Sequence, residues 1–259
     1  MKTKTLRSPL RGWLGGKFQL ANRIIPLIPE HTCYVEPFAG AAWVLFKKQP
    51  SKSEVINDIN QDVINLYRMI KHHPDALCNE LALALPSRNE FERLMLTPAE
   101  TLTEIQRAAR FLYIHRCSFG GKIYKNHFGT AKTSPPKFNP VSLQDELRLV
   151  HQRISRCFIE CQDYTQVIQR YDGKDTFFYI DPPYWGCEND YGEKIFSPED
   201  FKSLAELLID AKGKFLMSIN DTPEIREIYN DFNLTPVSLS YSVSKSKPTI
   251  ANELFITNF

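Results

Sequence analysis

The 259-residue sequence lacks the long apolar run that a membrane-spanning helix requires. No uninterrupted apolar stretch approaches about 20 residues, the length needed to cross a bilayer. The N-terminal segment 1–7 is basic, but no apolar segment follows it, so we expect no signal peptide. Apolar residues make up 42% and charged residues 24%, as in ordinary globular proteins. We therefore expect a soluble, cytoplasmic protein without membrane association.

Paired cysteines are also missing. None of the six cysteines belongs to a Cys-x-x-Cys pair, and they are scattered along the chain at Cys33, Cys78, Cys117, Cys157, Cys161 and Cys187. This pattern argues against a zinc site and against a disulfide framework, and it suits a reducing compartment. We predict no bound metal, and we interpret each cysteine as a small apolar side chain.

A common phosphate-binding pattern is absent as well. The Gly15-Gly16-Lys17 segment does not complete the G-x-x-x-x-G-K-[ST] pattern, which argues against nucleoside triphosphate binding. A single glycine, Gly40, stands in the turn after a predicted strand at 33–36. Small residues in such a turn let a ligand approach the backbone, and an acid such as Asp58, after the next predicted strand at 55–58, typically holds ribose hydroxyls. Together these features favour a nucleoside-containing cofactor, although Asp58 could instead cap a helix predicted over 60–72.

Acidic residues are absent from a stretch of the middle of the chain. No Asp or Glu lies between Ile105 and Gln144, where the basic residues are Arg107, Arg110, Arg116, Lys122, Lys125, Lys132 and Lys137. Its second half, 118–140, is a Gly/Pro/Ser/Asn-rich loop that carries several aromatic residues. A long basic loop with aromatics suits phosphate contacts and insertion into a base stack. We predict a nucleic-acid surface here, and the alternative is a solvated basic face.

The segment Asp181-Pro182-Pro183-Tyr184 follows a run of β-forming residues at 177–180. The exocyclic amine of adenine or cytosine is a poor nucleophile because its lone pair is delocalised into the ring. The Asp181 carboxylate and the Pro182 carbonyl could each accept one N–H of that amine and localise the lone pair, while the prolines hold the acceptors still. Tyr184 offers a flat face for a base taken out of the helix. The alternative is a tight turn without chemistry.

Strands and helices alternate along most of the chain, which predicts a mainly parallel sheet with an antiparallel edge. We expect further strands at 158–161 and 214–220 and a closing hairpin of 237–243 with 253–257. Helices are predicted around 20–28 and 143–154. Further helices should begin at Ser197-Pro198 and Thr222-Pro223, and a Thr97-Pro98-Ala99-Glu100 capping box should begin another.

Six segments in this order resemble the Dam family of DNA N6-adenine methyltransferases over nearly the full chain. They are Trp13-Leu14-Gly15-Gly16-Lys17, Val35-Glu36-Pro37-Phe38-Ala39-Gly40, Asn57-Asp58-Ile59-Asn60, Asp181-Pro182-Pro183-Tyr184, Met217-Ser218-Ile219-Asn220-Asp221 and Asn252-Glu253-Leu254. The resemblance implies an α/β, Rossmann-like S-adenosylmethionine-dependent methyltransferase sheet with an inserted, mainly helical target recognition domain. It places the catalytic domain at 1–65 and 145–259 and the insert at 66–144, and it implies a bacterial or phage-infected cell.

The resemblance also implies roles for individual residues. Asp181, Pro182 and Tyr184 would be catalytic. The cofactor S-adenosylmethionine would be bound by Trp13, Lys17, Glu36, Phe38, Gly40, Asp58, Asp163, Tyr164 and Asp181. Double-stranded DNA would be bound by Arg116, Phe119, Lys122, Tyr124, Lys125 and Asn126, with Arg116 on the backbone and Phe119 as a wedge in the base stack. We expect a monomer without an obligate protein partner.

The chain departs from the family in the recognition insert. Members that read GATC carry a basic residue where Gly12 stands here, and a longer R-x-N-x-x-G-x-F-N-x-P-F-G-like run where this chain has only 124–130. Each base contact contributes about 1–3 kcal/mol of discrimination. We therefore predict a site other than plain GATC, or relaxed specificity. An N4-cytosine DNA methyltransferase, an N6-adenine RNA methyltransferase and a catalytically silent nucleic-acid-binding protein remain as alternatives.

Overall fold

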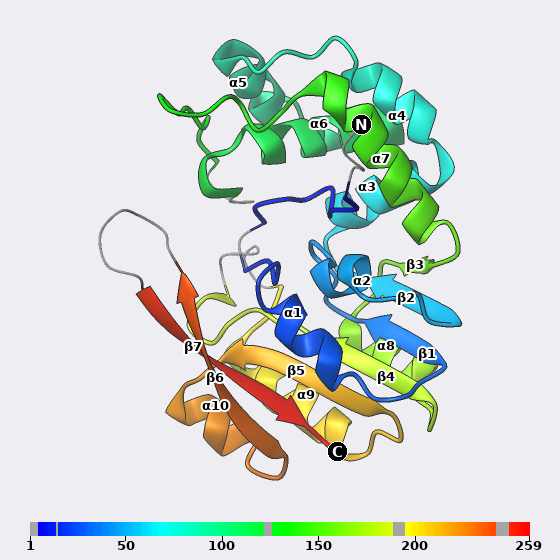
Figure 1. The fold of residues 1–259 in the computed structure, drawn as a ribbon, viewed down its shortest axis with the longest axis vertical. Helices are drawn as coiled ribbons and strands as arrows, with labels where there is room; N and C mark the ends of the chain where they lie inside the picture. The colour runs from blue at the N-terminus through cyan, green and yellow to red at the C-terminus, as the bar shows by residue number, and fades with distance from the viewer. Residues whose placement is uncertain (1–4, 14, 122–125, 189–194, 242–248) are drawn as a thin grey trace. The chain divides into compact units, whose positions relative to one another are not determined.

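The chain forms two compact units (Figure 1). The computed structural model describes residues 5–13, 15–121, 126–188, 195–241 and 249–259. Unit 1 contains residues 1–22, 40–49 and 60–161, and unit 2 contains residues 23–39, 50–59 and 162–259. Helices dominate the first unit, and a β-sheet dominates the second.

The sheet has seven strands in the order β3-β2-β1-β4-β5-β7-β6, and all but β3 belong to unit 2 (Figure 1). The strands are β1 (Cys33–Glu36), β2 (Ser53–Asn57), β3 (Phe158–Glu160), β4 (Thr176–Ile180), β5 (Lys214–Asn220), β6 (Asn233–Tyr241) and β7 (Thr249–Thr257). Strand β1 pairs in parallel with β2 and β4, and β4 pairs in parallel with β5. Strand β7 is antiparallel to β5 and β6. The predicted parallel sheet with an antiparallel edge is confirmed.

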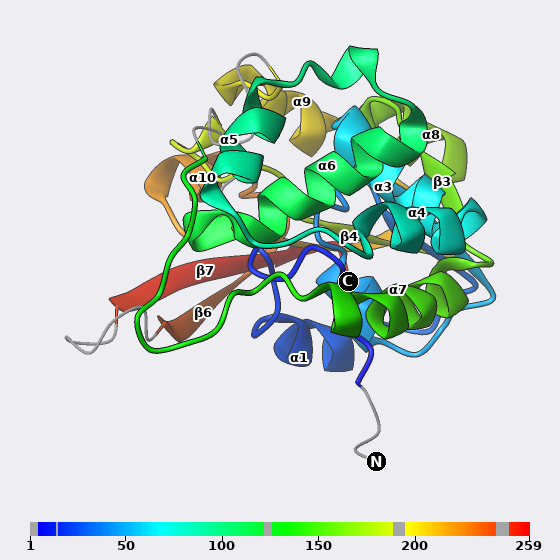
Figure 2. The same cartoon turned by 90° about the horizontal axis from the view of Figure 1, so that it is seen from above.

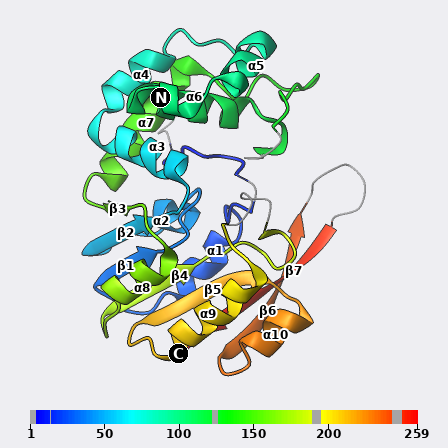
Figure 3. The ribbon, with the colours of Figure 1, turned by 180° about the vertical axis from the view of Figure 1, so that it is seen from behind.

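Central strand β4 is buried along its whole length, as its run of aromatic and β-branched residues requires. The unit 2 helices α8 (Tyr164–Tyr171), α9 (Pro198–Ile209) and α10 (Pro223–Ile228) lie on one face of the sheet (Figure 3). Apolar side chains of α9, among them Phe201 and Leu204, join strand residues such as Phe178 in the core. As predicted, α9 begins with Ser197, whose backbone N–H donates to Asp200 at 2.7 Å. Short α1 (Ala21–Ile24) and η1 (Ile25–Leu27) cover the predicted segment at 20–28.

Unit 1 is built around α6 (Glu104–Cys117), which packs against α3, α4 and α5 (Figure 2). Its other elements are α2 (Trp43–Lys47), α3 (Gln61–His72), α4 (Pro74–Leu81), α5 (Arg88–Leu96), η2 (Ala99–Thr101), η3 (Phe119–Gly121) and α7 (Pro140–Ile154). The unit is larger than the predicted insert at 66–144, because α3 and α7 cross the ends of that range and both pack within the helical cluster.

Two helix starts differ from the expected ones. The side chain of Asn60 caps α3 by accepting from the backbone N–H groups of Asp62 and Val63, so the alternative role of Asp58 as this cap is wrong. The capping box predicted at Thr97 is also wrong. The Thr97 hydroxyl donates back to the carbonyl of Arg93 in the preceding helix, and Thr103 forms the box instead.

Candidate active site

Polar residues stand at the carboxyl ends of the parallel strands β1, β2, β4 and β5 of unit 2. Glu36 ends β1, Asn57 ends β2, Asp181 follows β4 and Asn220 ends β5. In parallel strands these ends lie at one edge of the sheet, where open α/β folds bind their ligands. The structure therefore gathers the predicted catalytic acid and several predicted cofactor residues at this edge.

Asp181 is half-buried and begins a loop whose two prolines are buried. Ser218, a fully buried residue of β5, donates from Oγ to Asp181 Oδ1 at 3.4 Å. The Ser218 hydroxyl also shares a hydrogen bond of 2.8 Å with the Tyr179 hydroxyl. The adjacent strand therefore orients the Asp181 carboxylate, and the rigid prolines limit its backbone.

The remainder of this loop is held by Asn220 and Glu253. The Asn220 side chain accepts from the backbone N–H of Trp185 at 2.9 Å and donates to the Trp185 carbonyl at 3.0 Å. The Tyr184 hydroxyl donates to both carboxylate oxygens of Glu253, each 2.6 Å away. We name residues 181–185 the catalytic loop.

No role was predicted for Ser218, Asn220 or Glu253, although each lies in a segment that carries the family resemblance. The available signal was polarity: Ser218 lies between two buried apolar residues of β5, and Asn220 and Glu253 each stand beside one, Ile219 and Leu254 respectively. A polar side chain in a buried strand needs a partner, and here the partners belong to the catalytic loop.

Asn57 joins two predicted cofactor segments within unit 2. It is 1% exposed, and its side-chain amide donates to the carbonyls of Pro37 and Gln162, each at 2.9 Å. Its side-chain oxygen accepts from the Gln162 backbone N–H at 2.9 Å. As a result, the segment 36–38 and the segment 163–164 lie together, and Phe38 stacks on Tyr164 with 5.2 Å between ring centroids.

Tyr164 and Asp163 also form hydrogen bonds that stabilise unit 2. The Tyr164 ring is buried, its hydroxyl donates to the Asp200 carboxylate at 3.3 Å, and burial raises its pKa. Asp163 is exposed and caps α8 by accepting from the Thr165 backbone N–H at 2.9 Å. Any contact of these residues with a cofactor must coexist with these bonds.

Glu36 and Asp58 stand at the tips of neighbouring strands. Glu36 is 1% exposed and accepts from the Tyr34 hydroxyl at 2.6 Å. Burial, followed by the Glu36 charge, raises the Tyr34 pKa, so this hydroxyl stays a donor. Asp58 is half-buried just after β2. Of the two acids, Asp58 is therefore the more accessible at this edge of the sheet.

Three predicted cofactor residues, Trp13, Lys17 and Gly40, lie in unit 1. Gly40 has a φ of +44°, and a Cβ atom there would lie 3.0 Å from Trp13 Nε1, so a larger residue would press on the indole. The Tyr67 hydroxyl donates to the Gly40 carbonyl at 2.8 Å and fixes this turn. Lys17 is 5% exposed, and its Nζ donates to the Gly15 carbonyl at 3.0 Å.

Arg116 lies in the interior of unit 1 and not on its surface. It is 4% exposed, its Nε donates to the Pro9 carbonyl at 2.8 Å, and it forms an ion pair of 3.2 Å with Glu146, which Arg11 shares. Burial lowers the Arg116 pKa to about 10, so the guanidinium stays charged at neutral pH. These bonds give Arg116 a structural role, and its predicted contact with the DNA backbone finds no support in them.

The basic residues of the acid-free stretch fall into two groups, those that bond within unit 1 and those that are exposed. Arg107 pairs with Asp62, and Arg110 donates to the Leu94 carbonyl, so α6 uses its arginines inside unit 1. Lys132 and Lys137 are exposed in the loop that follows. Three residues predicted to bind DNA, Lys122, Tyr124 and Lys125, lie outside the described residues.

Backbone hydrogen bonds close the base of the predicted nucleic-acid-binding loop, residues 118–140, which we name the recognition loop. The Phe119 N–H donates to the His127 carbonyl at 2.8 Å, and the Gly129 N–H donates to the Cys117 carbonyl at 2.7 Å. Phe119 is 70% exposed, as a residue that inserts into DNA must be. Asn126 is half-buried.

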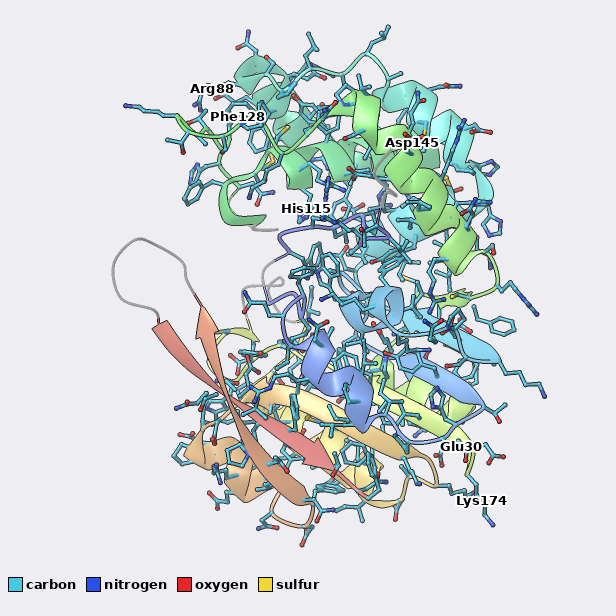
Figure 4. All side chains as sticks on the ribbon, in the orientation of Figure 1. Glu30, Arg88, His115, Phe128, Asp145 and Lys174 are labelled. Carbon is cyan, nitrogen blue, oxygen red and sulfur yellow. The ribbon has the colours of Figure 1, made fainter. Side chains whose placement is uncertain are left out.

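On its inner side this loop is anchored to α5. The Phe128 ring packs on Phe91, and the Arg88 guanidinium lies 5.2 Å from the Phe128 ring centroid (Figure 4). A pocket of about 440 Å³ lies between the end of α6 and this loop, with Phe119 and Lys137 in its wall.

Within the described ranges, no cluster of three or more His, Cys, Asp or Glu side chains could hold a metal ion. In the same part of the chain, no helix combines the length and the apolar character needed to cross a membrane.

An α/β sheet with acids at its strand ends and an Asp-Pro-Pro-Tyr loop is the arrangement of a Rossmann-like methyltransferase. Residues 13–243 match the model of the D12 class N6 adenine-specific DNA methyltransferases, and the chain belongs to this family. The predicted family resemblance is confirmed. The chain is therefore a site-specific DNA methyltransferase that acts on adenine, and its family membership supports S-adenosylmethionine as the methyl donor.

Several curated proteins are similar over most of this chain. A Type II methyltransferase of Lactococcus lactis subsp. cremoris is 30% identical over 282 residues, covering 100% of this chain and 98% of the relative. A DNA adenine methylase of Haemophilus influenzae is 28% identical over 268 residues, covering 95% and 91%. The DNA N-6-adenine-methyltransferase of Escherichia phage P1 is 30% identical over 253 residues, covering 90% of this chain and 32% of that protein.

Proposed function

We propose that this chain transfers a methyl group from S-adenosylmethionine to the N6 amine of an adenine flipped out of duplex DNA, by direct in-line transfer. The observation that carries the proposal is the fixed position of the catalytic loop, in which Ser218 orients Asp181 and Asn220 holds Trp185 at both backbone polar atoms. Preorganised acceptors of this kind lower a barrier because they need not reorganise during the reaction.

In the proposed reaction, the Asp181 carboxylate and the Pro182 carbonyl accept the two N–H groups of the adenine amine. This arrangement favours a tetrahedral nitrogen with a directed lone pair. S-adenosylmethionine, when bound, supplies an electrophilic methyl group on a positively charged sulfur. Asp181 then holds the amine proton that the methylated nitrogen releases. No covalent enzyme intermediate is needed.

The strand ends fit a nucleoside-containing methyl donor. Asp58 would accept from the ribose hydroxyls, and Asp163 and Tyr164 would face the cofactor adenine. Glu36, Phe38 and Gly40 would surround the methionine end, with Trp13 and Lys17 at its border. The tight approach of Gly40 to Trp13 supports this assignment, since a Cβ atom would narrow that turn.

Tyr184 would stack on the flipped adenine, because a base inside a duplex cannot reach the catalytic loop. Phe119 would fill the gap in the base stack, and Asn126 with its neighbours would contact the site. The family departures at Gly12 and at 124–130 support a target other than plain GATC, or relaxed specificity.

The test is single-molecule sequencing of genomic DNA from a methylation-deficient host that expresses the chain, with the Asp181→Ala variant expressed at the same level as control. Methyladenine at one sequence motif supports the proposal and defines the site. Methyladenine spread over many contexts supports the chemistry with relaxed specificity. N4-methylcytosine, or unmodified DNA with methylated RNA, contradicts it, as does methyladenine that persists in the Asp181→Ala control.

A further inference from the structure

We propose that Glu253 is a positioning residue that acts through Tyr184 and holds the ring on which the flipped base stacks; this inference rests on the proposed function. Glu253 is 2% exposed, and both of its carboxylate oxygens accept from the Tyr184 hydroxyl at 2.6 Å. Among the described residues, no basic side chain forms an ion pair with Glu253. Burying a carboxylate is unfavourable unless it is hydrogen-bonded, and here the Tyr184 hydroxyl is the donor.

The register of the sheet explains why Glu253 reaches the loop. Asn220 of β5 and Glu253 of β7 are directly opposite each other, so their side chains leave the same face of the sheet. Ser218 lies two residues earlier on β5 and therefore on that face as well. Three polar side chains at one end of the β5–β7 pair thus hold three parts of the catalytic loop, at Asp181, Tyr184 and Trp185.

Tyr184 is consequently held on both sides. Asn220 fixes the backbone just after it through two hydrogen bonds to Trp185, and Glu253 fixes the far end of its ring. A ring tied at both ends keeps one orientation before the base arrives. Stacking on it then needs no ordering of the ring, which favours a productive position of the adenine amine beside Asp181.

The charge of Glu253 makes this role distinguishable from simple packing. In a Tyr184→Phe variant, the buried carboxylate loses its donor while the ring remains, and an unsatisfied buried charge is costly. Glu253→Gln keeps the size and one acceptor but removes the charge. Adding Glu253→Gln to Tyr184→Phe should therefore relieve part of the damage and not increase it.

The experiment measures the single-turnover rate of adenine methylation and the fluorescence of duplexes with 2-aminopurine at the target position. We expect Glu253→Ala and Tyr184→Phe each to lower the rate about tenfold, as loss of a charge-assisted hydrogen bond predicts. The double variant Tyr184→Phe/Glu253→Gln should be no slower than Tyr184→Phe. DNA affinity should stay within about twofold, while the 2-aminopurine signal changes because the base lies on a less ordered ring.

Two matched controls separate positioning from stability. Tyr229→Phe removes a buried hydroxyl that donates to the Phe201 carbonyl at 3.0 Å in the same unit. Glu224→Gln neutralises an exposed acid of α10. Tyr229→Phe should lower the thermal midpoint but leave the rate per active site unchanged, and Glu224→Gln should change neither.

Three results would overturn the inference. The first is a Tyr184→Phe/Glu253→Gln variant whose rate is lower than that of Tyr184→Phe by the full loss that Glu253→Gln causes alone. The second is a Glu253→Ala variant that loses thermal stability yet keeps the wild-type rate and fluorescence. The third is a wild-type chain that methylates no adenine, which contradicts the proposed function itself. Because the wild-type measurement stands apart from the variants, failure of the function and failure of the Glu253 role are distinguished.

Discussion

The catalytic loop of unit 2 and the recognition loop of unit 1 are held in different ways. Side chains from neighbouring strands bind the catalytic loop at three points, through the buried Ser218 and Glu253 and the half-buried Asn220. The recognition loop is closed at its base by backbone hydrogen bonds, and its Phe119, Lys132 and Lys137 stay exposed. These differences fit the proposed roles, since chemistry needs fixed atoms and contact with DNA needs exposed side chains.

The interiors of the two units differ in the same sense. The core of unit 2 consists of aliphatic and aromatic side chains, and Glu36, Asn57 and Asn220 stand at the ends of its strands. Unit 1 buries His115 and Arg116 beside its helical core, with Glu146 as the partner of Arg116. Each of the following changes tests one side of this contrast.

The largest effect is expected from Asp181→Ala in the catalytic loop. Removing the acceptor for the adenine amine should reduce methyl transfer by at least about 10³-fold, since the site would lose its main preorganised acceptor. DNA binding and cofactor binding, measured by fluorescence anisotropy and calorimetry, should largely persist. Turnover retained in this variant would contradict the catalytic assignment.

A smaller loss is expected when the loop is only loosened. Asn220→Ala removes both hydrogen bonds to the Trp185 backbone, and we expect kcat to fall about 10–100-fold with little change in KM for DNA. Asn233→Ala is the matched control, because among the described residues the side chain of this exposed β6 residue hydrogen-bonds only to the Phe259 carbonyl. Equal kinetics of the two variants would show that the loop keeps its position without Asn220.

The sequence predicts the strand ends well, but it does not predict the hydrogen bonds that hold the catalytic loop. Strands at 33–36 and 214–220 were recognisable because short apolar runs end abruptly in polar residues. The bond from Tyr184 to Glu253 joins residues 69 positions apart, and the bonds between Trp185 and Asn220 span 35. Such pairs depend on the order and register of strands, which local patterns do not contain.

Unit 1 shows the same limit. Charge composition treats all seven basic residues of the acid-free stretch alike, yet Arg116 is buried by Pro9 and Glu146, which lie far away in the chain. A helix was predicted after the Thr97-Pro98 segment, but local patterns do not show that Arg116 of α6 is buried. Unit 1 extends beyond the predicted insert at 66–144, because α3 and α7 belong to it through packing.

Substitutions in the recognition loop should change DNA affinity and leave the rate of methyl transfer unchanged. Replacing Lys132 and Lys137 together by Ala removes two exposed charges, so the slope of log K against log salt should fall by about 2. Methylation at saturating DNA should be unchanged. As the contrasting pair, Arg107→Ala and Arg110→Ala should lower the free energy of unfolding, because these arginines bond inside unit 1. A salt slope unchanged by the lysine variant would remove Lys132 and Lys137 from the DNA surface.

The smallest effect concerns the pH dependence of unit 1. His115 packs on Trp13 with 5.5 Å between ring centroids and bonds the Arg11 carbonyl at 3.1 Å (Figure 4). Burial, followed by the charge of Arg116, lowers its pKa from 6.5 to about 4. Below pH 6.5, His115 binds a proton in the unfolded chain but stays neutral in the folded chain. The free energy of unfolding therefore falls as the pH drops toward 4.

Between pH 7.5 and 5.5 this linkage should remove about 1 kcal/mol from the free energy of unfolding measured with urea. His115→Gln, which keeps a donor for the Arg11 carbonyl but does not titrate, should show a flatter profile. Hydrogen exchange should locate the loss: the amides of α6 should lose protection on acidification before those of β4 and β5. Equal pH profiles for the wild type and His115→Gln, or an earlier loss in the sheet, would show that the buried histidine does not make unit 1 the more acid-sensitive of the two.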